Sequence, residues 1–177
     1  GVMSKITIFG LAGTGTSSVG KALTEKLGYR FVSGGDIFWR KKAEEMGITL
    51  PELHKLAKND ERFDKECDEA IKKFGKENDN FVLESRLAWF FIPNSFKIKL
   101  VCDFETRVKR LAERDGLSFK AAREHVIARE KADEERYQRY YNISELGPDE
   151  KFDIIVDSTN TPADKIVEML LNKAKLR

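Results

Sequence analysis

A glycine-rich stretch near the N-terminus is the feature that most constrains this chain. Residues 10–18 read GLAGTGTSS and directly follow the apolar run Lys5–Phe9. A short buried strand, closely spaced glycines and a hydroxyl residue at the start of a helix are typical of a loop that binds phosphate through its backbone N–H groups. The stretch departs from this pattern at Thr16, because such loops carry a lysine at that position.

The loop has two readings, a phosphate site or a tight turn that binds nothing. We favour the phosphate site, because three glycines at these spacings between a strand and a helix rarely occur by accident. Backbone amides, the helix dipole and Mg²⁺ can act without the lysine, so binding can survive its loss. Ser17 stands at the position of the Mg²⁺-binding hydroxyl. The sequence does not say whether another cation reaches the transferred phosphoryl group. The residues expected to bind phosphate are Gly10, Gly13, Thr14, Gly15, Thr16, Ser17 and Ser18.

The alternation of apolar runs and helical patterns predicts an α/β fold. At 177 residues the chain suits a single domain. Long helical patterns between the apolar runs imply parallel strands joined by crossovers, as in the three-layer sandwich of P-loop NTPases with a parallel five-stranded sheet. The expected strands are Lys5–Phe9, Tyr29–Ser33, Asn80–Glu84, Lys97–Cys102 and Phe152–Val156. The expected helices cover about 17–27, 36–46, 50–57, 63–74, 105–114, 119–141 and 163–173.

Two segments, 36–78 and 115–142, are mostly polar and rich in both charges. Helices with a weak apolar stripe are poorly anchored to a core. They are therefore either flaps that close over a substrate or ordinary solvated helices, and the sequence favours neither reading.

Composition excludes several classes of partner. The formal net charge is only +2, so no overall field attracts nucleic acid or an anionic membrane. No apolar run approaches the ~20 residues of a membrane helix. Cys67 and Cys102 lack the spacing of a metal site or a disulfide framework. We expect a cytoplasmic monomer that binds small molecules, without nucleic-acid or membrane partners.

Polar residues follow the expected strands at their carboxyl ends, where ligands bind in parallel sheets. Arg86 follows the third strand directly, and its guanidinium could fork onto a phosphate or form a structural pair with Glu84. Glu84 or Asp103 could hold Mg²⁺ through water. The other candidates at these ends are Ser33, Gly35 and Asp36.

A second group of charges lies in the segment 115–142. Arg129, Asp133 and Arg136 are spaced four and three residues apart, which places them on one helix face. This face is either a solvated ion-pair ladder or a surface that brings guanidinium groups to the transferred phosphate. Spacing alone does not decide between the two.

With these residues assembled, the chain resembles the nucleoside monophosphate kinases, and most closely the archaeal-type cytidylate kinases. The likeness covers nearly the whole chain. It is carried by ITIFGLAGTGTSS, LGYRFVSGGDIF, LESRLA, AREKADEERYQRYYNI and FDIIVDSTNTP.

The resemblance implies transfer of a phosphoryl group from ATP to CMP or dCMP with Mg²⁺. It implies a monophosphate-binding insert at 36–78 and a lid at 115–142. Arg86 matches the arginine that grips the acceptor phosphate, and Thr16 matches a variant found in this group. The lid residues implied to contact the acceptor and the phosphates are Arg129, Asp133 and Arg136.

One position departs from the resemblance. The family's GDIFR places an arginine where this chain has Trp39, and Arg40 follows. A shift of one residue in the helix would let Arg40 bind the acceptor. Two other functions stay open: a kinase for another nucleoside monophosphate or small molecule, and a nucleotide-binding module without transfer activity, for which Thr16 is the argument.

Overall fold

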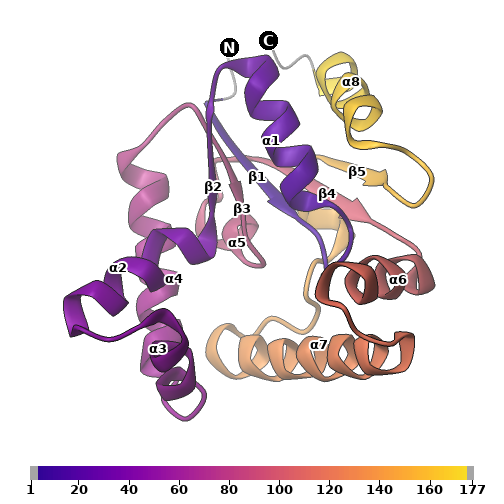
Figure 1. Cartoon of the computed structure of the whole chain (residues 1–177). Coiled ribbons are helices and arrows are strands. Elements are labelled where there is room, and N and C mark those ends of the chain that lie inside the picture. The colour runs from indigo at the N-terminus through magenta and orange to yellow at the C-terminus, as the bar shows by residue number, and fades with distance from the viewer. Residues whose placement is uncertain (1–3, 175–177) are drawn as a thin grey trace.

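Five parallel strands form the centre of the molecule (Figure 1). The computed structural model of the chain describes residues 4–174. The strand order is β2-β3-β1-β4-β5, with β1 in the middle, so the predicted α/β class with a parallel five-stranded sheet is confirmed. The strands are β1 (Lys5–Phe9), β2 (Arg30–Ser33), β3 (Phe81–Glu84), β4 (Phe96–Val101) and β5 (Ile154–Asp157).

The helices connect these strands and cover both faces of the sheet. They are α1 (Thr16–Leu27), α2 (Gly34–Met46), α3 (Leu50–Ala57), α4 (Arg62–Glu77), α5 (Ala88–Phe91), α6 (Phe104–Asp115), α7 (Phe119–Tyr141), the 3₁₀ helix η1 (Asp149–Lys151) and α8 (Ala163–Ala174). Every predicted helix is present within the described residues. Helices α5 and η1 were not predicted, because elements of four and three residues are too short to show a period.

Two predicted boundaries are wrong for identifiable reasons. Helix α2 begins at Gly34 and not at Asp36, because the Ser33 hydroxyl caps it by accepting a hydrogen bond from Asp36 N. Strand β5 begins at Ile154 and not at Phe152, because the Phe152 N–H closes the 3₁₀ turn on the Asp149 carbonyl at 3.2 Å.

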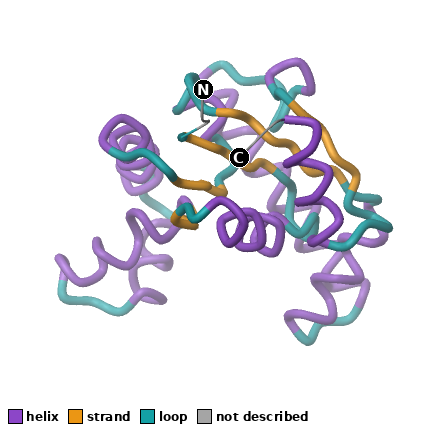
Figure 2. The backbone as a smooth tube through the Cα atoms, turned by 90° about the horizontal axis from the view of Figure 1, so that it is seen from above, coloured by secondary structure: helices purple, strands orange, loops and turns teal. Residues whose placement is uncertain are grey.

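The core consists of two clusters, one on each face of the sheet. Figure 2 shows the strands running between helices on both sides. Helices α1 and α8 cover one face, and helices α4 and α5 cover the other together with the C-terminal part of α7. The largest side chains that are fully buried are Phe81, Ile6, Ile8, Leu23, Leu53, Leu83, Leu87, Ile98, Leu100, Ile166 and Leu170.

The parallel sheet brings the carboxyl ends of all five strands to one edge, between the helices α2–α3 and the helices α6–α7 (Figure 1). Ile8 pairs with Glu84 in β3, and Glu84 pairs with Ser33 in β2. The loop after β1 therefore lies beside the residues that follow β2 and β3. This is the position where ligands bind in open α/β sheets.

The two segments predicted to close over a ligand contain α2 to α4 and α7. Helix α2 packs on α4, and α7 packs on α6. Helix α7 is long and mostly polar, and its buried residues are Ala122, Val126, Asp133 and Tyr137. Motion of either segment stays a prediction. Within residues 4–174, no helix has both the length and the apolar character needed to cross a membrane.

Candidate active site

The glycine-rich loop connects β1 to α1 with two residues in the left-handed region. Gly13 has φ 86° and Gly15 has φ 90°, a conformation that glycine adopts without a steric penalty. Between them, Thr14 closes a turn on the Leu11 carbonyl through its N–H at 3.1 Å and its hydroxyl at 2.8 Å. A Cβ on Gly10 would lie 2.2 Å from the Thr14 hydroxyl, so this position is also restricted to glycine.

Helix α1 begins directly after this loop with its first N–H groups unused. In the described part of the chain, the N-cap Gly15 has no side-chain cap and the first turn has no acidic residue. The N–H groups of Thr16, Ser17 and Ser18 have no intrahelical acceptor, as in any first turn, and they carry the positive end of the helix dipole. A Cβ at Gly15 would meet no heavy atom within 4 Å, so the space in front is open. The geometry is that of an anion site.

Thr16 does not restore the missing charge. Its methyl group lies 2.5 Å from the position of a Cβ on Gly10, so the side chain packs over the loop itself. Residues 10–18 contain no lysine or arginine. Any cation that acts on a bound phosphate must therefore come from another segment.

A hydroxyl and a carboxylate meet beside the loop. The Ser17 hydroxyl donates to Glu84 Oε2 at 2.8 Å, and both side chains lie at the sheet edge. Mg²⁺ prefers oxygen ligands of this kind and usually keeps several waters, so the Ser17–Glu84 pair would suit a Mg²⁺ ion. Asp103 instead caps α6 by accepting from Thr106 N at 3.1 Å. Of the two acids that the sequence left open, the contacts favour Glu84.

Three guanidinium groups surround one buried carboxylate on α7. The Asp133 side chain is 2% exposed, and its Oδ2 lies 3.8 Å from Arg86 Nη1 and 3.5 Å from Arg129 Nε. Its Oδ1 lies 3.7 Å from Arg136 Nη1. All three distances are ion pairs and too long for hydrogen bonds. We call these four residues the Asp133 cluster.

The Asp133 cluster has unused hydrogen-bonding capacity. Arg86 Nη1, Asp133 Oδ2 and Arg136 Nε are buried and have no hydrogen-bond partner among the described residues. Burial lowers the pKa of Arg86, and the charge of Asp133 partly offsets this. A desolvated cation with a free donor is costly unless an anion reaches it. Among the described residues Arg86 pairs with Asp133 and not with Glu84, which accepts a hydrogen bond from Ser17.

Arg129 and Arg136 lie on two sides of the cluster. A cavity of about 90 Å³ lies between α6 and α7, and its lining includes Ala12 of the loop, Arg86 and Arg129. Arg136 Nη1 instead lies 3.7 Å from Asp64 Oδ2 on α4. Arg129 therefore lies on the side of the glycine-rich loop, and Arg136 lies on the side of the segment 36–78.

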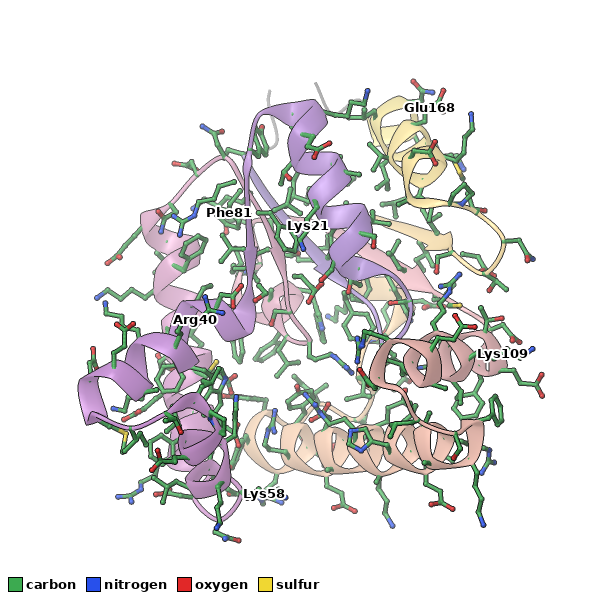
Figure 3. All side chains as sticks on the ribbon, in the orientation of Figure 1. Lys21, Arg40, Lys58, Phe81, Lys109 and Glu168 are labelled. Atoms are coloured by element: carbon green, nitrogen blue, oxygen red, sulfur yellow. The ribbon has the colours of Figure 1, made fainter. Side chains whose placement is uncertain are left out.

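The first residues of α2 lie near the residues that follow β3, but Arg40 on the same helix does not. Gly34 packs on Ser85, where a Cβ would lie 3.1 Å from the Ser85 Cβ, so neighbouring Ser33, Gly35 and Asp36 lie close to the residues after β3. Arg40, labelled in Figure 3, is 74% exposed and 4.0 Å from Asp36 on its own helix. The structure does not bring Arg40 into contact with Arg86 or the loop. Trp39, at the departing position, packs on His54 with ring centroids 5.1 Å apart.

The family model of the cytidylate kinase-like family matches residues 5–160. This chain belongs to the cytidylate kinase-like family. The curated cytidylate kinase of Methanobrevibacter smithii is 33% identical over 97% of this chain and 98% of its own length. The curated cytidylate kinase of Archaeoglobus fulgidus is 32% identical, with coverage of 98% and 96%.

Solved structures agree with the fold. The shikimate kinase of Bacteroides thetaiotaomicron superposes with a TM-score of 0.66 at 16% identity, over 98% of this chain and 99% of that chain. A likeness at this identity supports the three-layer architecture and says nothing about the acceptor.

Sequence reasoning missed two arginines in this cytidylate kinase-like chain. Arg107 and Arg110 on α6 donate hydrogen bonds to the loop carbonyls of Ala12 and Gly13, each at 3.1 Å. Their spacing of three residues places both on one helix face, which was the available signal. It was not decisive, because α6 is rich in charges that the sequence cannot sort into exposed and buried.

A second missed contact joins the two helical segments. The Tyr141 hydroxyl on α7 donates to Asp68 Oδ2 on α4 at 2.5 Å, and Asp68 is 8% exposed. Burial raises the pKa of Asp68 to about 6, although the hydrogen bond from Tyr141 lowers it. Because the folded state then binds a proton more tightly than the unfolded state, this group lowers stability as pH rises from about 4 to about 6.

Replacing Asp68 by asparagine is therefore expected to stabilise the protein above pH 6. The amide oxygen of the new side chain can still accept from Tyr141 but carries no charge, so the free energy of unfolding should rise by about 2 kcal/mol at pH 8 and change little at pH 4. Urea unfolding followed by tryptophan fluorescence at both pH values measures this. Glu69→Gln, which neutralises an exposed neighbour on α4, is the control. Equal stability of wild type and Asp68→Asn at pH 8 would contradict the raised pKa.

Proposed function

We propose that this protein transfers the γ-phosphoryl group of ATP to CMP or dCMP, giving ADP and CDP or dCDP. The observation that carries the proposal is the arrangement of the Asp133 cluster opposite a loop of uncapped amides. Three guanidinium groups around one carboxylate leave an excess of positive charge between two sites for phosphate. The curated relatives named cytidylate kinase support the choice of acceptor.

The donor is held by the main chain. The N–H groups at the start of α1, from Thr16 to Ser18, bind the ATP phosphates. Thr14 shapes the loop instead, because its N–H and its hydroxyl both bond to the Leu11 carbonyl. Ser17 and, through water, Glu84 would hold Mg²⁺, which would neutralise phosphate charge when bound. The chain adds little covalent chemistry, since phosphoryl transfer depends mainly on positioning and electrostatics.

The acceptor is held by Arg86. In the free protein Asp133 is the anion beside this guanidinium, at ion-pair distance and without a hydrogen bond. A CMP phosphate can offer Arg86 the two short hydrogen bonds that Asp133 does not make. Ser33, Gly35 and Asp36 border the same site, and Arg40 reaches it only if the insert closes.

The transferred group is stabilised by the lid arginines. Arg129 faces the loop and Arg136 faces the insert, so the two bracket the path between donor and acceptor. Asp133 holds both in place between turnovers. In this role they offset charge in the transition state, as an arginine finger does.

An acceptor panel tests the proposal. Purified protein with ATP and Mg²⁺ is given CMP, dCMP, UMP, AMP, GMP or shikimate, and ADP release is measured with the nucleotide product confirmed by chromatography. CMP or dCMP should give the highest kcat/KM. A higher value with another acceptor would assign the same chemistry to a different substrate. Tight ATP binding without CDP or any other product would indicate a nucleotide-binding module.

Removing Arg129 tests the assignment of the lid. Arg129→Ala is expected to lower kcat about 100-fold with little change in the KM for ATP, because the lost contact forms in the transition state. Arg136→Ala should also raise the KM for CMP, since Arg136 faces the insert. Lys131→Ala removes an exposed cation from the same helix and is the control. Unchanged turnover in both arginine variants would remove the lid from the mechanism.

We further propose a monomer that acts in the cytoplasm and binds neither nucleic acid nor membrane. The support is the small net charge of +2, which gives no strong attraction to nucleic acid or an anionic membrane, and the sites for small anions at the loop and the Asp133 cluster. Size-exclusion chromatography with light scattering measures the oligomeric state.

A further inference from the structure

Helix α6 runs directly behind the phosphate loop. A Cβ on Gly13 would lie 2.7 Å from the Arg107 carbonyl oxygen and 2.9 Å from its Cα, so the two backbones touch. Arg107 and Arg110 extend from this contact to the loop. The loop without a cation is thus packed on a helix that presents two.

Three consecutive loop carbonyls are held from this side. Ala12 O accepts from Arg107 Nη1 at 3.1 Å, Gly13 O from Arg110 Nη1 at 3.1 Å, and Thr14 O from the Ser158 hydroxyl at 2.6 Å. In a trans peptide the C=O and the next N–H point in opposite directions. Holding Ala12 O and Thr14 O therefore turns the N–H groups of Gly13 and Gly15 away from α6.

The two arginines differ in whether a carboxylate compensates their positive charge. Arg107 Nη1 also donates to Glu130 Oε1 at 2.7 Å, and this carboxylate compensates its charge. The partners of Arg110 are all neutral: the carbonyls of Gly13, Ser158 and Thr159 and the sulfur of Cys102. No carboxylate among residues 4–174 lies within ion-pair distance of it. Arg110 thus places one uncompensated positive charge on the loop.

We propose that Arg110 supplies, from behind the loop, the positive charge that the loop lacks at Thr16. It is a positioning residue, because it does not touch the phosphates. It strengthens binding of the donor's polyphosphate by its hydrogen bond to the Gly13 carbonyl and by the electrostatic field of its guanidinium group. The half-buried guanidinium acts at a site where screening by solvent ions is weak. This inference rests on the proposed function only in taking a nucleoside triphosphate as donor. It leaves to the lid arginines the charge that develops during transfer.

The experiment distinguishes the charge of the Arg110 side chain from its shape. It also distinguishes an effect on the polyphosphate from an effect on the nucleoside. Arg110→Gln keeps an amide donor for the Gly13 carbonyl and removes the charge, whereas Arg110→Lys keeps the charge. Lys109→Gln, an exposed residue of the same helix labelled in Figure 3, removes one charge without a loop contact. Binding of Mg-ATP and of inorganic tripolyphosphate with Mg²⁺ is measured by calorimetry, below the melting temperature of each variant.

Arg110→Gln should weaken both ligands about tenfold, which is a typical loss for one interaction with a charged group. Arg110→Lys should bind both within about threefold of wild type, and Lys109→Gln within about twofold. A purely structural role would lower the melting temperature and leave affinity in the folded protein unchanged, which overturns the proposal. So would weaker ATP binding with unchanged tripolyphosphate binding, because Arg110 would then act on the nucleoside.

The two proposals fail separately. Loss of tripolyphosphate affinity in Arg110→Gln with no CDP formed by wild type would support the role of Arg110 and reject the acceptor. CDP formation by wild type with unchanged tripolyphosphate affinity in Arg110→Gln would support the acceptor and reject the role of Arg110.

Discussion

Replacing Arg86 by alanine is expected to lower kcat/KM for CMP about 1000-fold, or about 4 kcal/mol of transition-state stabilisation. Arg86 is the one member of the Asp133 cluster that comes from the sheet edge itself, directly after β3, and it is mostly buried with a side chain 21% exposed. A bidentate contact between a desolvated guanidinium and a phosphate is among the strongest interactions available to this site. The KM for ATP should change little, because the loop amides remain.

The fold should survive this substitution. Asp133 keeps its ion pairs with Arg129 and Arg136, so no buried charge is left alone. Arg86→Lys should recover only a small part of the activity, because an ammonium group cannot make the two parallel contacts. Arg30→Gln is the matched control, since Arg30 starts β2 at the opposite end of the sheet. An equal rise in the KM for ATP and in the KM for CMP would contradict the assignment of Arg86 to the acceptor.

Gly13→Ala is expected to lower kcat/KM for ATP by about 1000-fold, since a displacement of about 1 Å in a catalytic group costs about 100-fold and weaker donor binding adds to it. Two causes act together. At φ 86° an alanine is strained, and its Cβ would lie 2.7 Å from the Arg107 carbonyl oxygen, which belongs to a helix backbone and cannot turn aside. The loop must therefore move away from α6.

Gly28→Ala carries the first cause, backbone strain, without the second, so comparison of the two variants isolates the effect of the contact with α6. Gly28 has φ 71° at the other end of α1, and a Cβ there meets nothing within 4 Å. It should cost about 1 kcal/mol of stability from backbone strain and leave the kinetics unchanged. Steady-state kinetics with varied ATP, together with melting temperatures, distinguishes the two variants. If Gly13→Ala binds ATP like wild type, contact with α6 does not set the geometry of the loop.

The strands, the loop and the long helices were predictable because their signals are local. A buried parallel strand appears as a short apolar run, and the loop is recognised by glycines at fixed spacing. Boundaries failed where a cap or a turn decided them, as at Ser33 and Phe152. Helix α5 could not be seen, because AWFF contains only one turn and its apolar residues also suit a loop packed on the core.

The sequence named several residues that the structure brings together, but not how they pair, and it missed Arg107 and Arg110. Arg129, Asp133 and Arg136 share a helix face by spacing alone, but only the structure shows that Arg86 joins them and that Asp133 is 2% exposed. The sequence could not choose between Glu84 and Asp103, since both lie at the carboxyl end of a strand. A single contact, from the Ser17 hydroxyl to Glu84, separates them.

The amino-acid sequence by itself determined the α/β class, the position of the phosphate loop and the absence of a cation within it, because these depend on residues adjacent in the chain. Tertiary structure alone decided which cations face the loop. Arg107 and Arg110 reach it from 95 and 97 residues away. Such contacts depend on which helix packs behind the sheet edge, and helix packing is set by the whole core and not by any local pattern.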